Sequence, residues 1–209
     1  MDASPERFGF VDEIVLSVLA PAEVVGGIVL QGMEPVFADL DPETMGLTVA
    51  TTTAQVTVHT KAVLVTPFQG VIGDWERLRS VTEPRAIALQ VEGEGKHCEW
   101  EPIDRGVWGM GTSLLRVDDQ LIYGGRDGFA ESLRDFGLKA EPIPSWRGRR
   151  SDYPGTTSIE SRTLVLNNWR EFRADISDCA RICARQGSFS FATRRGVQPA
   201  VLERLRRTG

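Results

Sequence analysis

A short apolar stretch between turn residues constrains this chain more than any other feature. Residues 60–70 read Thr-Lys-Ala-Val-Leu-Val-Thr-Pro-Phe-Gln-Gly. The run from Ala62 to Thr66 is aliphatic and β-branched, which is typical of a strand that is covered on both faces. A Pro and a Gly end the strand, and the sequence predicts that a helix begins at Asp74, where a carboxylate can accept hydrogen bonds from unpaired backbone N–H groups.

The same alternation of strands and helices continues along the chain. Strands that alternate with helices indicate an α/β layer fold with a mostly parallel sheet. Residues 141–157 are rich in Pro, Gly, Ser and Arg, which predicts a linker or an exposed loop. The other predicted strands lie at 12–18, 34–38, 85–91, within 107–115, at 121–125 and at 162–166, and the other helices at 21–31, 74–81, 128–136, 170–186 and 198–207.

Two stretches together resemble a known family. Residues 32–44 read Gly-Met-Glu-Pro-Val-Phe-Ala-Asp-Leu-Asp-Pro-Glu-Thr, and residues 60–74 hold the Thr-Lys-Ala strand, the Gly turn and the Asp that opens a helix. The chain therefore resembles the DegT/StrS-type nucleotide-sugar aminotransferases, which are fold-type I enzymes dependent on pyridoxal phosphate (PLP). The resemblance implies a three-layer α/β fold. Its expected parts are a truncated large domain over residues 1–140, a linker over 141–157 and a small α+β segment over 158–209.

The resemblance also implies a lysine that binds the cofactor, because PLP enzymes hold PLP as a Schiff base. The family places this lysine shortly after a serine, here Ser113, which puts the lysine position near Asp118. No lysine occurs between residues 97 and 138. Arg116 cannot replace it, because a guanidinium stays protonated and is not a nucleophile. Ser113 remains a candidate for contact with a cofactor.

Three further features of the family are absent or altered. The acidic residue that faces the pyridine nitrogen would have to be Gln90 or Glu92, and Pro21 stands where an aromatic residue stacks on the ring. The Ser-Gly-Thr helix start that grips the cofactor phosphate is missing. We therefore expect no cofactor, and PLP only if the lysine comes from elsewhere, for example from Lys96.

Other motifs favour ordinary structural roles. Cys179 and Cys183 lie four residues apart on one face of a predicted helix, which favours packing in a core over a zinc site, and we expect no metal. The basic run at 146–150 surrounds a tryptophan, but no accompanying motif supports nucleic-acid binding. We expect this loop to bind the acidic part of the chain or a partner subunit.

Composition and charge favour a folded cytoplasmic protein. Hydrophobic residues make up 41% of the chain and charged residues 25%, and no apolar run is long enough to span a membrane. Three cysteines are too few for a disulfide framework. Residues 141–209 hold 13 Arg against seven Asp and Glu, whereas residues 1–140 hold 11 Lys and Arg against 22 Asp and Glu. Such asymmetry fits docking onto an acidic surface or a phosphate-bearing ligand, or simply an Arg-rich genome.

Three hypotheses about function remain open. In the first, the chain is a degenerate homologue that cannot transaminate alone and acts as a partner in aminosugar or secondary-metabolite biosynthesis, as a homodimer or bound to an intact aminotransferase. In the second, its pocket binds a sugar nucleotide or runs a reaction that needs no lysine, with Glu92, His97 and Asp118 as candidate acid and base groups. In the third, the chain is a remnant without a role.

Overall fold

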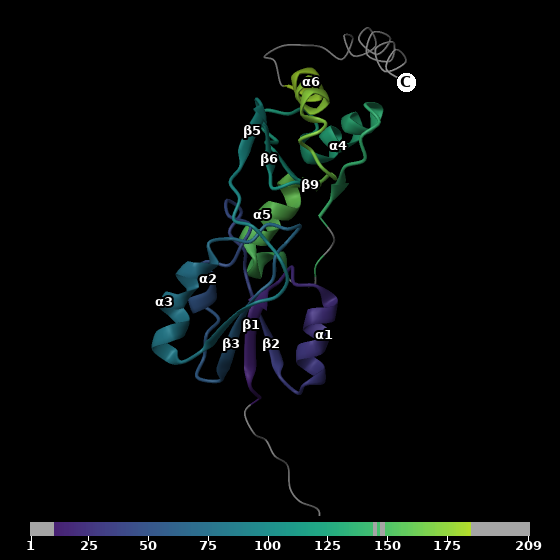
Figure 1. Ribbon diagram of the computed structural model, residues 1–209. Coiled ribbons are helices and arrows are strands. Elements are labelled where there is room, and N and C mark those ends of the chain that lie inside the picture. The colour runs from purple at the N-terminus through teal and green to yellow at the C-terminus, as the bar shows by residue number, and fades with distance from the viewer. Residues whose placement is uncertain (1–10, 144–145, 147–148, 185–209) are drawn as a thin grey trace, which may run out of the picture.

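The computed structural model describes residues 11–143, 146 and 149–184, which fold around two β-sheets that lie end to end (Figure 1). The first sheet has four parallel strands in the order β2-β1-β3-β4. It confirms the expected α/β fold with a parallel sheet and helices. The strand bounds are β1 (Glu13–Ser17), β2 (Glu34–Ala38), β3 (Thr60–Val65) and β4 (Ala88–Val91).

Helices cover both faces of the parallel sheet. Side chains alternate along a strand, so Leu64 of β3 packs in the cluster beneath α1 (Ala22–Leu30), whereas Val63 and Val65 pack in the core on the opposite face. All three side chains are buried. In Figure 1 the short helices α2 (Val49–Thr53) and α3 (Arg79–Thr82) lie on the other side of the strands from α1, which gives three layers.

The helix expected at residues 74–81 is divided into short turns. A 3₁₀ turn, η1 (Trp75–Leu78), leads into α3 and then into a second 3₁₀ turn, η2 (Glu83–Arg85). Asp74 precedes η1, but its side chain makes no capping hydrogen bond. One of its carboxylate oxygens instead lies 2.5 Å from Nε of Arg77. The predicted cap is therefore wrong, because the nearby guanidinium holds the carboxylate.

The second sheet is antiparallel and has the order β5-β6-β7-β9-β8. Its central strands separate two cores. Met110 and Leu114 contribute to the core that also contains the parallel sheet, whereas Leu115 and Val117 pack against helices on the outer face. The strand bounds are β5 (Glu101–Asp104), β6 (Val107–Met110), β7 (Leu114–Val117), β8 (Glu141–Pro142) and β9 (Thr163–Val165).

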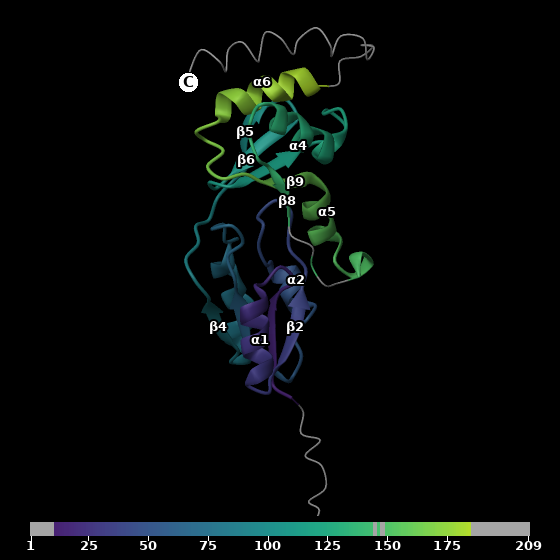
Figure 2. The ribbon, with the colours of Figure 1, turned by 90° about the vertical axis from the view of Figure 1, so that its right-hand side faces the viewer.

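Two helices, α4 (Gly125–Asp135) and α6 (Arg173–Cys183), close the outer core around Trp169 (Figure 2). The Trp169 indole is fully buried, and its Nε1 donates to the carbonyl oxygen of Gly111 at 3.2 Å. A Cβ atom at Gly109 would lie 2.4 Å from the indole, so only glycine fits there. Cys179 and Cys183 are buried in this core, as predicted.

Several sequence expectations differ from the structure in this second part. Residues 107–115, expected to hold one strand, contain β6, a turn and the start of β7, since Gly111 takes a positive φ of 59°. Residues 121–125 form a turn into α4 rather than a strand. The expected loop at 141–157 contains β8, the turn η3 (Arg150–Asp152) and the start of α5 (Pro154–Arg162). The expected helix at 198–207 lies outside the described residues.

The boundary between the two sheets lies between Val91 and Glu101. It falls within residues 1–140, which the sequence analysis expected to form one domain. β7 pairs with β9, and β9 pairs with β8, so strands from the segment 141–165 complete the sheet that β5, β6 and β7 begin. The described helices include none that is long and apolar enough to cross a membrane.

Asp39 joins the two sheets. It follows β2, and its Oδ1 accepts hydrogen bonds from the backbone N and from Oγ1 of Thr156, each at 2.7 Å. Its Oδ2 accepts from the backbone N of Gly155 at 2.7 Å. These donors form the first turn of α5, where backbone N–H groups lack partners within the helix. A Cβ at Gly155 would lie 1.9 Å from the carbonyl oxygen of Leu40, so the contact requires glycine.

The basic segment after β8 contacts its own chain where it is described. The rings of Trp146 and Tyr153 meet edge to face, with centroids 5.5 Å apart. Arg150 forms an ion pair with Glu160 of α5 at 3.0 Å, and this contact lowers the pKa of Glu160. Arg150 therefore stabilises α5 of the same chain.

Candidate binding site

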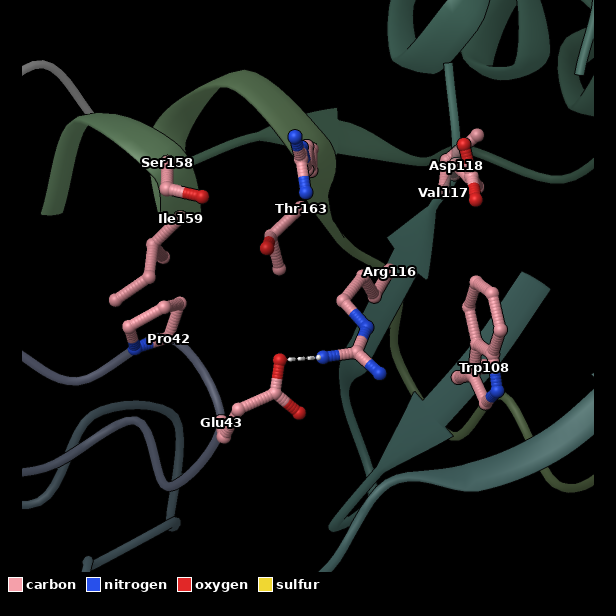
Figure 3. Close-up of a pocket in the computed structure, with 10 residues that line it drawn as sticks. Pro42, Glu43, Trp108, Arg116, Val117, Asp118, Ser158, Ile159 and Thr163 are labelled. Carbon is pink, nitrogen blue, oxygen red and sulfur yellow. Dashed lines mark hydrogen bonds and ion pairs between the residues drawn. The ribbon is translucent and has the colours of Figure 1, made fainter. Parts of the chain in front are cut away.

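A cavity of about 250 Å³ lies where the turn after β2 meets the hairpin β6–β7 and helix α5 (Figure 3). Three parts of the chain that are distant in sequence build it, and Asp39 holds two of them together. The lining side chains are Pro42, Glu43, Trp108, Arg116, Val117, Asp118, Ser158, Ile159, Arg162 and Thr163.

Arg116 is held at the centre of this cavity. It lies directly opposite Trp108 in the β6–β7 register, so both side chains point to the same face. The guanidinium carbon is 5.0 Å from the centroid of the Trp108 ring and 4.7 Å from that of Trp100, within the range of cation–π attraction. One Nη atom donates to Glu43 at 2.7 Å, a bond visible in Figure 3. These contacts fix the guanidinium plane while leaving other N–H donors for a ligand.

A second cavity of about 340 Å³ shares Glu43, Trp108 and Arg116 with the first. Its wall includes Trp100, whose Nε1 donates to the carbonyl oxygen of Pro42 at 3.2 Å. Thr44 also lines it, and the buried Oγ1 of Thr44 has no hydrogen-bond partner among the described residues. The two cavities share Glu43, Trp108 and Arg116 and are together called the groove below.

The groups in the groove are suited to binding. Arg162 has no hydrogen-bond or ion-pair partner among the described residues, so its donors are available. Arg116 and Arg162 donate, the carboxylates of Glu43 and Asp118 accept, and the Trp108 ring offers an apolar face. No lining hydroxyl or thiol of the described residues is hydrogen-bonded to a histidine or a carboxylate, as an activated nucleophile would be.

The residues predicted from the sequence lie apart. Asp118 lines the first cavity and His97 the second. Gln90 lies in β4, and the exposed Glu92 follows it, with its backbone N donating to Val65. Ser113 lies in the turn between β6 and β7. These five residues therefore form neither an acid–base pair nor a cofactor-binding site.

The sequence did not point to the central residues of the groove, which are Glu43, Trp100, Trp108 and Arg162. They come from four separate segments, and no fixed spacing connects them. The available signal was the alternation in residues 107–117, which places Trp108 and Arg116 on one face once the segment is recognised as a hairpin.

None of the three lysines of the chain lines either cavity, although Lys96 directly precedes His97, which does. Lys61 is 3.5 Å from Asp12 and Lys139 is 2.7 Å from Glu141, and all four side chains are well exposed. Lys96 lies in an exposed loop, where its backbone N donates to Gly70. The described residues contain no cluster of His, Cys, Asp and Glu that could hold a metal ion.

Comparison with known families and proteins accounts for the first part of the chain. Residues 8–90 match the DegT/DnrJ/EryC1/StrS aminotransferase family. The first part of the chain is thus similar to these aminotransferases. It is 28% identical over 136 residues to the L-glutamine:2-deoxy-scyllo-inosose aminotransferase of Streptomyces kanamyceticus, a match that covers 63% of this chain and 30% of that protein. The chain thus spans about a third of the length of the curated protein.

Solved structures of sugar aminotransferases share the fold of this chain. DesI, solved in the presence of its TDP-sugar product, aligns with a TM-score of 0.59 and 16% identity over 84% of this chain and 75% of that one. The PLP-form of a putative sugar aminotransferase from Streptococcus pneumoniae aligns with a TM-score of 0.62 and 9% identity over 82% of this chain and 81% of that one. At these identities the likeness concerns the fold.

Proposed function

We propose that this chain is a sugar aminotransferase-like protein that does not transaminate alone and acts as an accessory subunit in aminosugar or secondary-metabolite biosynthesis. The observation that carries the proposal is the position of its lysines. Family members depend on PLP, which is bound through a lysine and supplies the electron sink for transamination. None of Lys61, Lys96 and Lys139 lines the groove.

The groove residues support this inference because they do not fit PLP. A Schiff base requires an amine that can lose its proton, whereas the cations here are guanidiniums. Helix α1, which follows the first strand, begins after Pro21 without a side-chain hydrogen bond at its start.

A direct test uses the purified chain and PLP. We expect no internal-aldimine absorbance, and no borohydride-reduced adduct on any of the three lysines by mass spectrometry. Lys96→Arg serves as the control, since Lys96 follows β4 and is the lysine that the sequence suggests as a replacement. A saturable, stoichiometric adduct on Lys96 that Lys96→Arg abolishes would refute the proposal.

The accessory role is tested by co-expression with an intact sugar aminotransferase from the same genome. We expect the two chains to co-elute at a fixed ratio, and the kcat of the aminotransferase to change when the chain is omitted. An aminotransferase that neither binds the chain nor responds to it would contradict the accessory role.

The groove favours a second candidate function, the binding of a sugar nucleotide. Two arginines suit phosphate oxygens, and Trp108 suits stacking. Calorimetric titration with TDP and with a TDP-sugar tests this candidate. Arg116→Gln should weaken binding about tenfold or more, the loss expected for a charge-assisted hydrogen bond. Arg105→Gln, an exposed change outside the groove, should leave the affinity unchanged. Equal affinities for all three proteins would exclude the groove.

A further inference from the structure

Strand β4 forms one edge of the parallel sheet, and only one of its sides is paired. β3 occupies that side, with Val63 aligned to Leu89 and Val65 to Val91. Among the described residues, no backbone group hydrogen-bonds to the other side of β4. Figure 2 shows β4 at the outer margin of the sheet, without a strand beyond it. Such an edge is a template for pairing with another chain.

The outward-facing groups of β4 can be identified from one hydrogen bond. The backbone N of Glu92 donates to the carbonyl oxygen of Val65 at 2.9 Å, toward β3. Backbone groups alternate in direction along a strand. The groups of Gln90 therefore also face β3, whereas those of Leu89 and Val91 face outward.

The two edges of the sheet differ in protection. The opposite edge, β2, contains Pro35 and begins with the exposed Glu34, features that discourage strand pairing. β4 reads Ala-Leu-Gln-Val, without a charge or a proline. The side chain of Val91 is 38% exposed despite being apolar. β4 is thus the edge that remains open to a partner strand.

We propose that β4 pairs antiparallel with β4 of a second copy of this chain, about a two-fold axis that passes beside Gln90. In this register Leu89 of one copy lies opposite Val91 of the other, and both outward-facing residues exchange hydrogen bonds with their counterparts. The two Gln90 residues form the pair at the axis that is not hydrogen-bonded through the backbone, with Cα atoms about 4.5 Å apart. The two exposed amide side chains then meet across the axis.

Charge complementarity selects a second copy as the occupant. The chain carries Arg85 just before β4 and Glu92 and Glu94 just after it, and all three residues are exposed. Antiparallel pairing brings the start of one strand beside the end of the other, so Arg85 of each copy lies toward the acidic residues of its partner. A parallel arrangement would place like charges together, which is destabilising. The two-fold contact uses the same patch on both copies, the commonest arrangement in homo-oligomers.

This inference concerns the sheet edge and does not rest on the proposed function, which concerns the lysines and the groove. A dimer through β4 could therefore be found whether or not the chain binds PLP.

Charge substitution at the axis provides the first test. Sedimentation velocity should show the parent chain in a monomer–dimer equilibrium. Gln90→Lys and Gln90→Glu should each weaken dimerisation about tenfold or more, because two like charges would face each other at the axis. An equimolar mixture of the two variants should restore the dimer. A monomeric parent, or a dimer that both variants retain, would overturn the proposal.

Cross-linking locates the contact. Gln90→Cys should form an intermolecular disulfide under mild oxidation, since a Cα separation near 4.5 Å is within the range that a disulfide spans. Ser80→Cys, exposed on α3 and away from the edge, is the matched control and should remain uncross-linked. Equal cross-linking of both variants, or none at Gln90→Cys, would refute the proposed axis.

Discussion

The parallel and the antiparallel sheet of this protein are held together by different kinds of contact. In the parallel sheet, all four strands come from residues 13–91, and aliphatic side chains on both faces pack under short helices. In the antiparallel sheet, β7 pairs with β9, which lies far along the chain, and one buried tryptophan fills the core. The first sheet depends on local units, whereas the second depends on contacts between distant segments.

Polar contacts tie helix α6 and the preceding segment to the second sheet. Asp104 of β5 accepts from Oγ of Ser177 at 2.5 Å and from Nε of Arg181 at 3.0 Å. Arg170 pairs with Glu101, and Arg170 and Arg173 both lie over the Trp169 ring. In the parallel sheet, Glu13 of β1 accepts hydrogen bonds from the hydroxyls of Thr57 and Thr60, and no arginine of the described residues joins this contact. The two sheets should therefore respond differently to substitution and to pH.

The largest effect is expected at Trp169. Trp169→Ala should lower the free energy of unfolding by about 3–5 kcal/mol, because it removes the largest buried side chain of the second core and leaves a cavity. Urea unfolding followed by circular dichroism measures this loss. Trp169→Phe, which keeps an aromatic ring, should cost less. If both variants unfold like the parent, Trp169 does not organise the antiparallel sheet.

Leu64→Ala tests the parallel sheet in the same way. We expect a loss of about 2–5 kcal/mol, since Leu64 is buried between β3 and α1. The control is Leu30→Ala in α1, where the side chain is 89% exposed and the change should stay within about 0.5 kcal/mol. Similar melting temperatures for the two variants would show that β3 is not a central strand.

Asp39→Ala tests the junction between the sheets. The first turn of α5 would lose its acceptor, at an expected cost of about 1–3 kcal/mol. Asp39→Asn keeps one carbonyl oxygen and should cost less. Unfolding followed by tryptophan fluorescence and by circular dichroism should shift together. A variant as stable as the parent would contradict the role of Asp39 in joining the sheets.

Asp104 gives the second sheet a pH dependence. The hydrogen bond from Ser177, followed by contacts with Arg105 and Arg181, holds the pKa of Asp104 below its ordinary value. The resulting stabilisation is present above the unfolded pKa of about 3.9 and is lost as the pH falls through the lower folded pKa.

Asp104→Asn should therefore cost about 1–2 kcal/mol at neutral pH, and the difference from the parent should shrink in acid. Urea midpoints of both proteins at pH 7 and near pH 3 measure this. A difference that does not change with pH would show that the charge of Asp104 contributes nothing.

The smallest effect is expected at Asp74. Its side chain caps no helix and pairs only with the exposed Arg77. Asp74→Ala should change the melting temperature little, by the equivalent of less than about 0.5 kcal/mol. A loss comparable to that of Asp39→Ala would mean that Asp74 caps η1 in solution.

The same contrast explains what could be predicted from the sequence. The strands of the parallel sheet were located to within a few residues, because each is a short apolar run ended by a turn. The hairpin β6–β7 was taken for one strand, because Gly109 and Gly111 interrupt its pattern, and its pairing with β9 leaves no local trace. Residues 141–157 have the composition of a loop, yet among the described ones Glu141 and Pro142 form a strand that pairs with β9, and Pro154 begins α5.

The candidate site was likewise predictable only in part. Asp118 and His97 were selected and do line the groove, but its central residues were not recognised. Arg116 was considered only as a substitute for lysine. Its importance arises from Trp100, Trp108 and Glu43, which approach it only after the two sheets come together.

The carboxylate of Asp39 has a consequence for how this chain could be divided. Asp39 directly follows β2 of the parallel sheet and accepts hydrogen bonds from the first turn of α5, which supports the antiparallel sheet. Met110 and Leu114 of the antiparallel sheet complete the core of the parallel sheet. A cut between β4 and β5 would fall between the two sheets. If the halves separated, the first turn of α5 would lose its acceptor and the shared apolar core would be exposed to water. We therefore expect neither half to fold alone, so that insertion, deletion or gene fusion at this position would act on the whole protein.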